Sequence, residues 1–584
     1  MAETLISPGV LALENDNSFI TQQPVTVGAA IIGPTVKGPV EVPTIVTSYS
    51  DYQNKFGTTF LSGSQVYTYF TSIAAYNYFT NGGESLLVAR VVTGSFTSAT
   101  TATGSVTGPN GGGVSILNAN TSESVVLSTL SQGIIMNSSS SLDSSGALLS
   151  GSADNIRWQI ANRDTGSGTF SLLIRQGDDN ATDQTILETW TGLSMDPTAP
   201  NYVARVIGNQ VKVYDSTDNQ VVINGDYPNA SRYVYVANVL TPTPLYFDNN
   251  GNAKAQYTSS IPNNASGSFI GATGALFTGS AAKYYNTIIS GVTNIQGLNS
   301  SSYNNMINLL SNQDDYRFNV LTAPGLFASE APLGSSQVTS IINNTMNRGD
   351  NIFVSDLVPY SSSITSVTTQ AQAKNSSYAA SYWPWVQTID PDSAQLVWVP
   401  ASTMIAGVYA YNDSVSEPWF APAGINRGGL GNVVRAEKKL SQSNRDTLYS
   451  NKVNPIATFP GTGVVVYGQK TLQTKASALD RVNVRRLLIA LKSYISQVAN
   501  NLVFEQNTIA TRTSFLNQVN PYLESVQQRQ GLYAFKVIMD SSNNTPDVID
   551  RNQLVGQIYL QPTKTAEFIY LDFNILPTGA TFPA

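Results

Sequence analysis

A stretch near the C-terminus comes close to a common phosphate-binding motif. Gly463 and Gly468 are separated by four residues, and Lys470 and Thr471 follow shortly after. In a phosphate-binding loop, the residues between the glycines turn tightly so that their N–H groups point inward, while the lysine and threonine reach phosphate and magnesium. Here three valines and a tyrosine stand between the glycines, and these residue types favour a half-buried strand. Gln469 also displaces the lysine and threonine by one position. The sequence therefore predicts a strand between glycine turns and no nucleotide site.

The residue types that most often serve in catalysis and in transition-metal binding are missing from the chain. The chain has no histidine and no cysteine, which removes the commonest general base, the commonest transition-metal ligand and the best nucleophile. We therefore predict that it is not an enzyme and has no catalytic, cofactor-binding or metal-binding residues. Asp178, Asp179 and Asp183 lie close together in one segment, but the spacing and turn glycine of an EF-hand are absent. A solvated hairpin loop is favoured over a calcium site there.

The composition favours self-association. Only 12% of the residues are charged, about half the usual share, and Ser, Thr, Asn and Gln take their place. Such a surface has little charge repulsion. Residues 421–584 hold 17 Lys and Arg against 10 Asp and Glu, although the whole chain has a net charge of −7. The two ends thus favour different partners, one of them acidic. Nucleic acid is not predicted, because there is no reading motif and no dense Arg/Lys cluster.

The sequence carries no signal for export or membrane insertion. Its first ten residues lack the charged and apolar regions of a signal peptide. No run approaches the ~18 apolar residues that span a bilayer. We expect the protein to be made and folded in a cytoplasm.

We predict an α+β multidomain fold. Residues 23–94 and 276–420 alternate strand and helix patterns, so they are expected to form one discontinuous α/β core. Asp356 lies at a strand end where such sheets bind ligands, but no glycine-rich fingerprint accompanies it. Residues 95–275 are rich in Ser, Thr, Gly and Asn and carry short alternating runs, which predicts an inserted all-β domain. Residues 421–565 are expected to form an α+β C-terminal domain.

A long amphipathic helix is predicted within this C-terminal domain. It starts near Ser477 and Asp480, and apolar residues then recur every three or four positions. Arg481, Arg485 and Lys492 are spaced by four and seven residues, so they share one polar face. A solvated face and a contact surface are both open at this point.

Both ends of the chain are candidates for arms that leave the subunit. Strands are predicted at 532–540 and 556–562, and a further strand with two apolar faces opens the terminal segment 566–584. Such a strand can pair with the open sheet edge of another subunit, and about six to eight hydrogen bonds at about 1 kcal/mol net each give a durable link. Residues 1–22 hold one apolar patch between turn residues and indicate a second arm, with a frayed terminus as the alternative. The candidate arm residues are Leu5, Val10, Leu11, Leu13, Phe568, Ile569, Tyr570, Leu571, Phe573 and Ile575.

Several motifs resemble the contractile tail sheath proteins of long-tailed bacteriophages. The stretches FPGTGVVVYGQKTL, LDRVNVRRLL and NNTPDVIDRN are similar to the C-terminal domain of that family. The stretches SPGV, GPTVKGPVEVPTIVTSYSDYQNKFG and GGESLLVARVV are similar to its other half. The resemblance covers residues 1–95 and 415–584 closely and 276–415 loosely, and it leaves out 95–275.

The resemblance implies a structural protein with a mechanical role. Subunits of this family stack as rings around an inner tail tube, and on a signal from the baseplate the sheath shortens and drives the tube through the host envelope. The terminal arms would augment neighbouring sheets by strand donation. The inserted domain would face outward, and the C-terminal domain would lie against the tube, with the strand after Gly463 in its core. Energy would be stored in the assembly, without a cofactor.

The resemblance also implies partners and contact residues. The partners are further copies of the chain, the inner tail tube protein, and baseplate and tail terminator proteins, with no nucleic acid and no membrane insertion. The location is the virion tail, assembled in the host cytoplasm. The candidate tube contacts are Arg481, Arg485 and Lys492, with Lys438, Lys439 and Arg445 in reserve.

Two alternatives remain open. A carbohydrate-binding adhesin or depolymerase would use a groove of tryptophans and carboxylates within 95–275, where only Trp158 and Trp190 occur. The sheath of a tailocin or a secretion-type injector would look the same in sequence as that of a phage.

Overall fold

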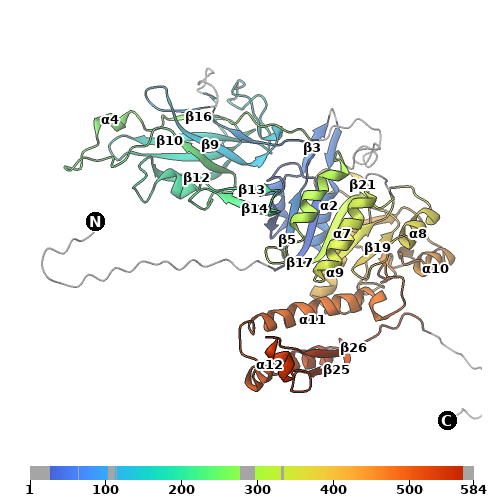
Figure 1. The fold of residues 1–584 in the computed structure, drawn as a ribbon. Coiled ribbons are helices and arrows are strands. Elements are labelled where there is room, and N and C mark those ends of the chain that lie inside the picture. The colour runs from blue at the N-terminus through green and yellow to red at the C-terminus, as the bar shows by residue number, and fades with distance from the viewer. Residues whose placement is uncertain are drawn as a thin grey trace, which may run out of the picture.

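The computed structural model describes residues 26–62, 65–102, 112–113, 115–276, 296–329 and 334–569. Within these ranges the chain is a mixed α and β protein with several sheets. A large sheet with helices on both faces lies in the middle, a β-rich part extends to one side, and a smaller part with two long helices lies below (Figure 1). We call them the central unit (26–92 and 296–472), the β-rich unit (98–272) and the C-terminal unit (482–562).

The central unit is built on an eight-stranded sheet. Its strands are β1 (Thr26–Gly33), β2 (Thr44–Val46), β5 (Leu86–Arg90), β17 (Arg317–Phe327), β18 (Ile352–Asp356), β19 (Ala379–Trp383), β23 (Asn454–Phe459) and β24 (Gly463–Val466). They lie in the order β2-β5-β1-β17-β18-β19-β23-β24, and all except the edge strands β2 and β24 run parallel. β1 pairs directly with β17, so segments on either side of the β-rich unit in the sequence share one sheet. Because such strands are covered on both faces, apolar residues occur on both faces of the strand rather than on one face only.

Two hydrophobic cores lie on the two faces of this sheet. Ala29 and Ile31 of β1 point into one core, and Ala30 and Ile32 point into the other, as the alternation of a strand requires. The helices that cover the first core are α1 (Tyr49–Phe56), α2 (Phe70–Thr80) and α9 (Ser402–Val415). The helices that cover the second core are α6 (Asn304–Leu309), α7 (Ser335–Arg348), α8 (Ile364–Gln372) and α10 (Gln442–Ser450).

Smaller elements complete the central unit. They are the hairpin of β3 (Thr59–Ser62) and β4 (Gln65–Thr68), the sheet of β20 (Val386–Ile389), β21 (Leu396–Val399) and β22 (Val433–Ala436), and the 3-10 turn η2 (Ser300–Tyr303). A further 3-10 turn, η3 (Ala478–Asp480), lies between the central unit and the C-terminal unit.

The stretch that nearly matches a phosphate-binding loop forms a strand, as predicted. β24 pairs antiparallel with β23, and Val464, Val465 and Val466 are buried. Gly463 has a φ of 84°, a conformation that favours glycine. This hairpin belongs to the central sheet, because Asn454 pairs in parallel with Tyr382 of β19. The structure thereby corrects two expectations: the boundary at residue 421, and the placing of this strand in the C-terminal domain.

Asp356 ends β18 and is buried at the start of α9. Its carboxylate accepts hydrogen bonds from the Ser402 hydroxyl (2.6 Å), the Ser402 N–H (3.2 Å) and the Gly325 N–H (3.2 Å). Burial raises its pKa to about 6, although these hydrogen bonds act in the opposite direction. The carboxyl group therefore joins β17, β18 and α9.

This raised pKa predicts how the stability of the central unit depends on pH. A carboxyl group with a raised folded-state pKa contributes its stability fully below the ordinary value near 3.8, and that contribution is lost as the pH rises through about 6. Relative to the Asp356→Asn variant, the free energy of unfolding of the wild type should therefore fall by up to about 3 kcal/mol between about pH 4 and pH 8. Hydrogen exchange of the β18 and α9 amides in both proteins measures this. An unchanged difference between the two proteins across that pH range would contradict the prediction.

The β-rich unit consists of short strands and two short helices. Its elements are β6 (Ser98–Thr100), β7 (Gly112–Gly113), β8 (Ile116–Leu117), β9 (Glu123–Gln132), η1 (Ile134–Met136), β10 (Ile156–Asp164), β11 (Thr169–Gln176), β12 (Ile186–Ser194), α3 (Val203–Ile207), β13 (Val211–Asp215), β14 (Gln220–Asn224), β15 (Val234–Val239), α4 (Ala255–Thr258) and β16 (Ala265–Ser268). They form a five-stranded sheet β12-β11-β10-β16-β7, a sheet β15-β9-β6 with β8 beside β9, and the hairpin β13-β14. Trp158 lies fully buried in their common core.

Several contacts fix the β-rich unit to the central unit. The β13-β14 hairpin lies beside β5 in Figure 1, and its Tyr214 and Val221 pack against the central core. Arg90 at the end of β5 is fully buried and donates hydrogen bonds to the carbonyls of Gly38 (2.5 Å) and Gln132 (2.8 Å). One guanidinium thus joins the two units.

The acidic loop of the β-rich unit differs from the predicted solvated hairpin. Asp179 is buried, and its carboxylate binds both Arg157 (3.3 Å) and Arg175 (2.7 Å). Asp178 is exposed and accepts a hydrogen bond from Gln176. The two arginines stand on neighbouring strands, and only the packing of β10 against β11 brings them to the same carboxylate. The expectation of a solvated loop is therefore wrong for Asp179.

Candidate inter-subunit interface

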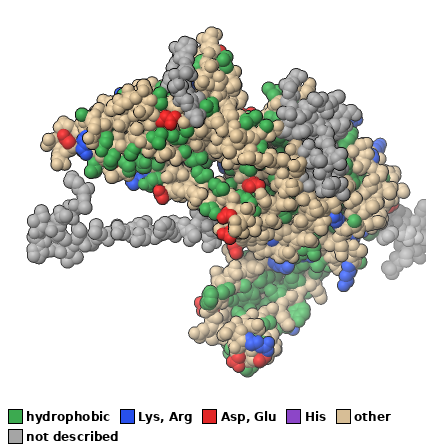
Figure 2. Space-filling model, turned by 45° about the horizontal axis from the view of Figure 1, so that its top comes forward, with side chains coloured by type: hydrophobic (Ala, Val, Ile, Leu, Met, Phe, Trp, Pro, Cys, Tyr) green, Lys and Arg blue, Asp and Glu red, His purple; other side chains and the backbone are tan. Residues whose placement is uncertain are grey.

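The C-terminal unit packs two long helices against a two-stranded sheet. Its elements are α11 (Val482–Asn500), α12 (Ile509–Gln528), β25 (Leu532–Ile538), α13 (Pro546–Asp550) and β26 (Gln557–Pro562). The predicted amphipathic helix is α11, and its Leu487 and Leu491 meet Val519 and Leu523 of α12 in a shared core. Figure 2 shows hydrophobic side chains gathered on the lower part of the molecule, where this unit lies.

The sheet of this unit is an antiparallel hairpin with two open edges. β25 and β26 pair from Ile538↔Gln557 to Leu532↔Pro562, and no other strand among the described residues pairs with either of them. A two-stranded sheet is marginal in isolation, and a strand edge with unpaired N–H and C=O groups is a template for another chain. Neither outer edge of this hairpin is therefore occupied by a strand of the described residues.

The two faces of the hairpin differ in exposure. Phe535, Val537 and Leu560 pack half-buried against the helices. Tyr533 and Tyr559 lie on the opposite face and are 62% and 56% exposed. These large aromatic side chains project from the exposed face of the hairpin.

Most of the predicted arm residues lie outside the described ranges. This applies to the N-terminal candidates Leu5, Val10, Leu11 and Leu13 and to the C-terminal candidates Tyr570, Leu571, Phe573 and Ile575. Phe568 and Ile569 are described, and their side chains are 71% and 77% exposed. Two adjacent apolar side chains without cover thus stand where the predicted C-terminal arm begins.

The predicted basic face of α11 lies against the central unit. Arg485 is only 3% exposed, its guanidinium lies 3.8 Å from the centre of the Tyr378 ring, and it donates to the Ser377 hydroxyl (2.5 Å). Burial lowers the pKa of Arg485. Lys492 is exposed and donates to the Tyr378 hydroxyl (3.1 Å), while Arg481 forms an ion pair with Glu567 (2.7 Å). Of the two readings left open for this face, the solvated one does not hold for Arg485, because Tyr378 covers its guanidinium.

The reserve candidates belong to the central unit rather than to the C-terminal unit. Lys438 donates to the Ser362 carbonyl (2.5 Å) and Arg445 lies 5.3 Å from the centre of the Phe459 ring. Lys439 is exposed. The structure does not bring these three residues together with Arg481, Arg485 and Lys492 on one helix.

Sequence reasoning missed an exposed apolar cluster at the turn between α11 and α12. Val503, Phe504 and Ile509 are all exposed, and Phe504 has a φ of 71°. α11 ends at Asn500, before this stretch. The Asn500-Asn501 pair is the signal that could have marked this end, since asparagine favours helix termini.

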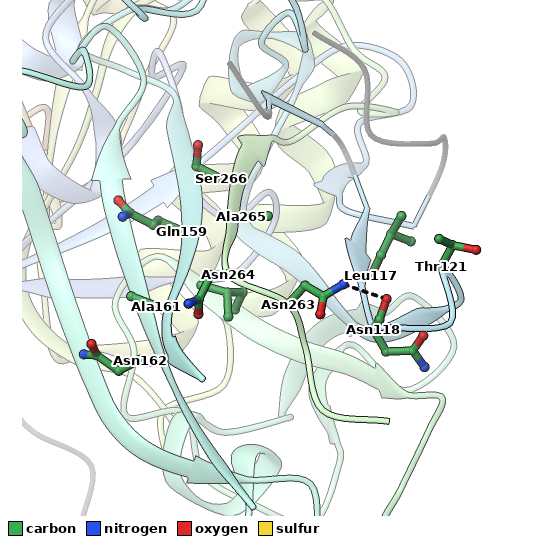
Figure 3. A pocket seen from close by; sticks show the side chains of 11 residues that line it. Leu117, Asn118, Thr121, Gln159, Ala161, Asn162, Asn263, Asn264, Ala265 and Ser266 are labelled. Atoms are coloured by element: carbon green, nitrogen blue, oxygen red, sulfur yellow. Dashed lines mark hydrogen bonds between the residues drawn. The ribbon is translucent and has the colours of Figure 1, made fainter. Parts of the chain in front are cut away.

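The tryptophans of the β-rich unit do not form a carbohydrate groove. Trp158 is in the core, and Trp190 is half-buried and donates to Glu188 (3.2 Å). The hollow of about 740 Å³ in this unit is lined instead by amide, hydroxyl and aliphatic side chains. Two of the lining residues are joined by a hydrogen bond, from the Asn263 amide to the Asn118 carbonyl (Figure 3). The groove that would support an adhesin is therefore not formed by these two tryptophans.

The described ranges contain neither a cluster of metal ligands nor a helix suited to cross a membrane. There, no three His, Cys, Asp or Glu side chains are grouped so that they could hold a metal ion. None of the described helices has both the length and the hydropathy to cross a bilayer.

Comparison with known families identifies two segments. Residues 299–472 match the model of the phage tail sheath protein central domain. Residues 474–576 match the model of the phage tail sheath C-terminal domain. The border between the two matches coincides with the end of the central unit.

Curated tail sheath proteins match about a third of the chain. The tail sheath protein of Vibrio phage KVP40 is 46% identical over 185 residues, which are 32% of this chain and 28% of that protein. The tail sheath protein of Enterobacteria phage T4 is 42% identical over 185 residues, with the same shares. The match thus spans less than a third of the length of these relatives.

A solved structure supports the fold over a longer stretch. The sheath tail protein from Listeria innocua covers 92% of this chain and 96% of its own, with a TM-score of 0.51 at 10% sequence identity. At this identity the likeness concerns the fold alone.

Proposed function

We propose that the chain is the structural subunit of a contractile tail sheath, because residues 299–472 and 474–576 match the two domain models of phage tail sheath proteins. In this proposal copies of the chain polymerise around an inner tail tube, and contraction drives the tube through the host envelope. The family is one of structural proteins, and we assign the chain no reaction. A tailocin or a secretion-type injector would use the same kind of subunit.

The observation that carries this proposal is the open β25-β26 hairpin. Each of its outer edges lacks a partner strand among the described residues, Tyr533 and Tyr559 are exposed on one of its faces, and Phe568 and Ile569 are exposed at the start of the terminal segment. A strand from each of two neighbouring copies would complete a four-stranded sheet. This would pair the open backbone groups and cover the aromatic rings.

We assign the parts of the chain accordingly. Residues 26–92 and 296–472 would form the discontinuous core of the subunit, and the β-rich unit, inserted between them, would face outward. Residues 1–22 and 566–584 would be the N-terminal and C-terminal arms. The boundary before the C-terminal domain moves from the predicted residue 421 to about 473, where the central sheet ends and the second family match begins.

The proposal separates durable contacts from contacts that must break. Strand pairing between copies rests on several backbone hydrogen bonds, and these would hold while rings turn past one another. Contacts to the tube protein would be exposed ion pairs, each contributing about 0–1 kcal/mol. Lys492 and Lys439 are exposed and remain candidates for that role, whereas buried Arg485 does not. Baseplate and tail terminator proteins would be the partners at the two ends of the assembly.

Electron microscopy of the purified chain tests the proposal. Since the subunit carries its own open edges and arms, we expect the full-length chain to form hollow tubes without any partner. Negative staining at increasing protein concentration would show them. A monodisperse monomer at all concentrations would contradict self-assembly.

A further inference from the structure

The segment that follows β26 returns to the central unit and is held there. Arg481, which directly precedes α11, donates two hydrogen bonds to the Glu567 carboxylate, from Nε to Oε1 (2.7 Å) and from Nη2 to Oε2 (3.0 Å). This is the bidentate arrangement in which a guanidinium and a carboxylate bind most strongly. Glu567 is the last charged residue before exposed Phe568 and Ile569.

Two neutral side chains complete the binding of this carboxylate. The Tyr449 hydroxyl of α10 donates to Oε2 (2.8 Å). Gln469, which is buried just after β24, donates from Nε2 to Oε1 (3.0 Å) and to the Thr565 hydroxyl (2.6 Å). Burial by itself would raise the pKa of Glu567, but the hydrogen bonds from Arg481, Gln469 and Tyr449 outweigh it and lower this pKa. The site therefore favours the ionised carboxylate.

We propose that Tyr449, Gln469 and Arg481 form a socket that fixes the root of the C-terminal arm to the central unit. The role of the arm rests on the proposed function; the socket itself is a feature of the single chain. Glu567 is a positioning residue in this proposal, since it sets where residues 568–584 leave the subunit.

The position of the socket decides which part of the subunit resists a pull on the arm. Force applied beyond Ile569 reaches Glu567 before it reaches β26, which ends at Pro562. Without the socket, that force would act on the β25-β26 hairpin, whose hydrogen bonds would open one after another. With the socket, the force passes to α10 and to the segment after β24, which belong to the eight-stranded sheet unit. The small hairpin is thus protected while it binds its neighbours.

Limited proteolysis tests the socket in the single chain. Lys564 is exposed, and trypsin cleavage after it releases residues 565–584 as one peptide that mass spectrometry can follow. Because Thr565 and Glu567 are held, this bond should be protected in the wild type, and Glu567→Gln should release the peptide at least about tenfold faster. Glu524→Gln is the matched control, since it removes the same charge from an exposed position on α12. Equal release from all three proteins under monomeric conditions would overturn the proposal.

Assembly tests whether the socket positions the arm. We expect Glu567→Gln to raise the protein concentration needed for tube formation about tenfold, with an unchanged circular dichroism spectrum of the monomer. The exchange of both charges, Arg481→Glu with Glu567→Arg, should restore part of the loss. Tube formation by Glu567→Gln at the wild-type concentration would overturn the positioning role. If the wild type itself forms no tubes, the proposed function fails, whereas the proteolysis result still decides whether the socket exists.

Discussion

A chain that ends at Glu567 is expected to remain a folded monomer and to form no tubes. It keeps the socket contacts of Glu567 and loses residues 568–584, so the open edges of β25 and β26 no longer receive a strand from the C-terminus of a neighbour. About six to eight hydrogen bonds per junction are lost, at about 1 kcal/mol each. Each subunit in a polymer makes the same junction, so the loss is repeated along the assembly. Negative-stain microscopy and sedimentation compare this chain with the full-length chain.

A second variant separates the loss of strand pairing from the loss of length. Proline at position 571 or 573 removes a backbone N–H from the arm of the full-length chain and leaves the rest intact. We expect Leu571→Pro and Phe573→Pro to weaken tube formation strongly, and the same change at Ala584, the last residue, to have little effect. Normal tubes from the truncated chain would show that the C-terminal arm is not the link between subunits.

Asp179→Ala is expected to destabilise the β-rich unit by about 3–5 kcal/mol. The substitution removes the one carboxylate that Arg157 and Arg175 share, and both guanidinium groups stay buried. A buried charge without its partner costs far more than the pair contributes, so this change ranks among the most disruptive in the unit. Hydrogen exchange of the β10 and β11 amides reports the loss locally.

Asp178→Ala provides the control for this prediction. Asp178 is the neighbouring residue, is exposed, and accepts a hydrogen bond from Gln176, so its removal should change the stability by less than about 0.5 kcal/mol. Equal effects of the two substitutions would contradict the importance of the buried cluster. If the β-rich unit faces outward as proposed, Asp179→Ala should still form tubes, because the arms and the β25-β26 hairpin are untouched.

The sequence by itself determined those features that depend on neighbouring residues. The glycines and valines at 463–466 predicted a strand rather than a phosphate loop, and β24 is that strand. Apolar spacing predicted α11, and alternation predicted β25 and β26. The motifs between 459 and 562 pointed to the phage tail sheath family, which the family models then matched. Such signals are local, because strand and helix periods are set by backbone geometry.

Only the tertiary structure decided which charged side chains are available to a partner. Arg485 and Lys492 occupy similar positions on the helix pattern, but Tyr378, more than a hundred residues earlier, covers one and leaves the other exposed. Gln469, which spoils the phosphate motif in the sequence, holds Glu567 from 98 residues away. The boundary between the central unit and the C-terminal unit also depends on a contact between distant segments, because β23 pairs with β19. These outcomes depend on contacts between distant segments. The spacing of residues along a chain does not predict which distant side chain will cover a given residue.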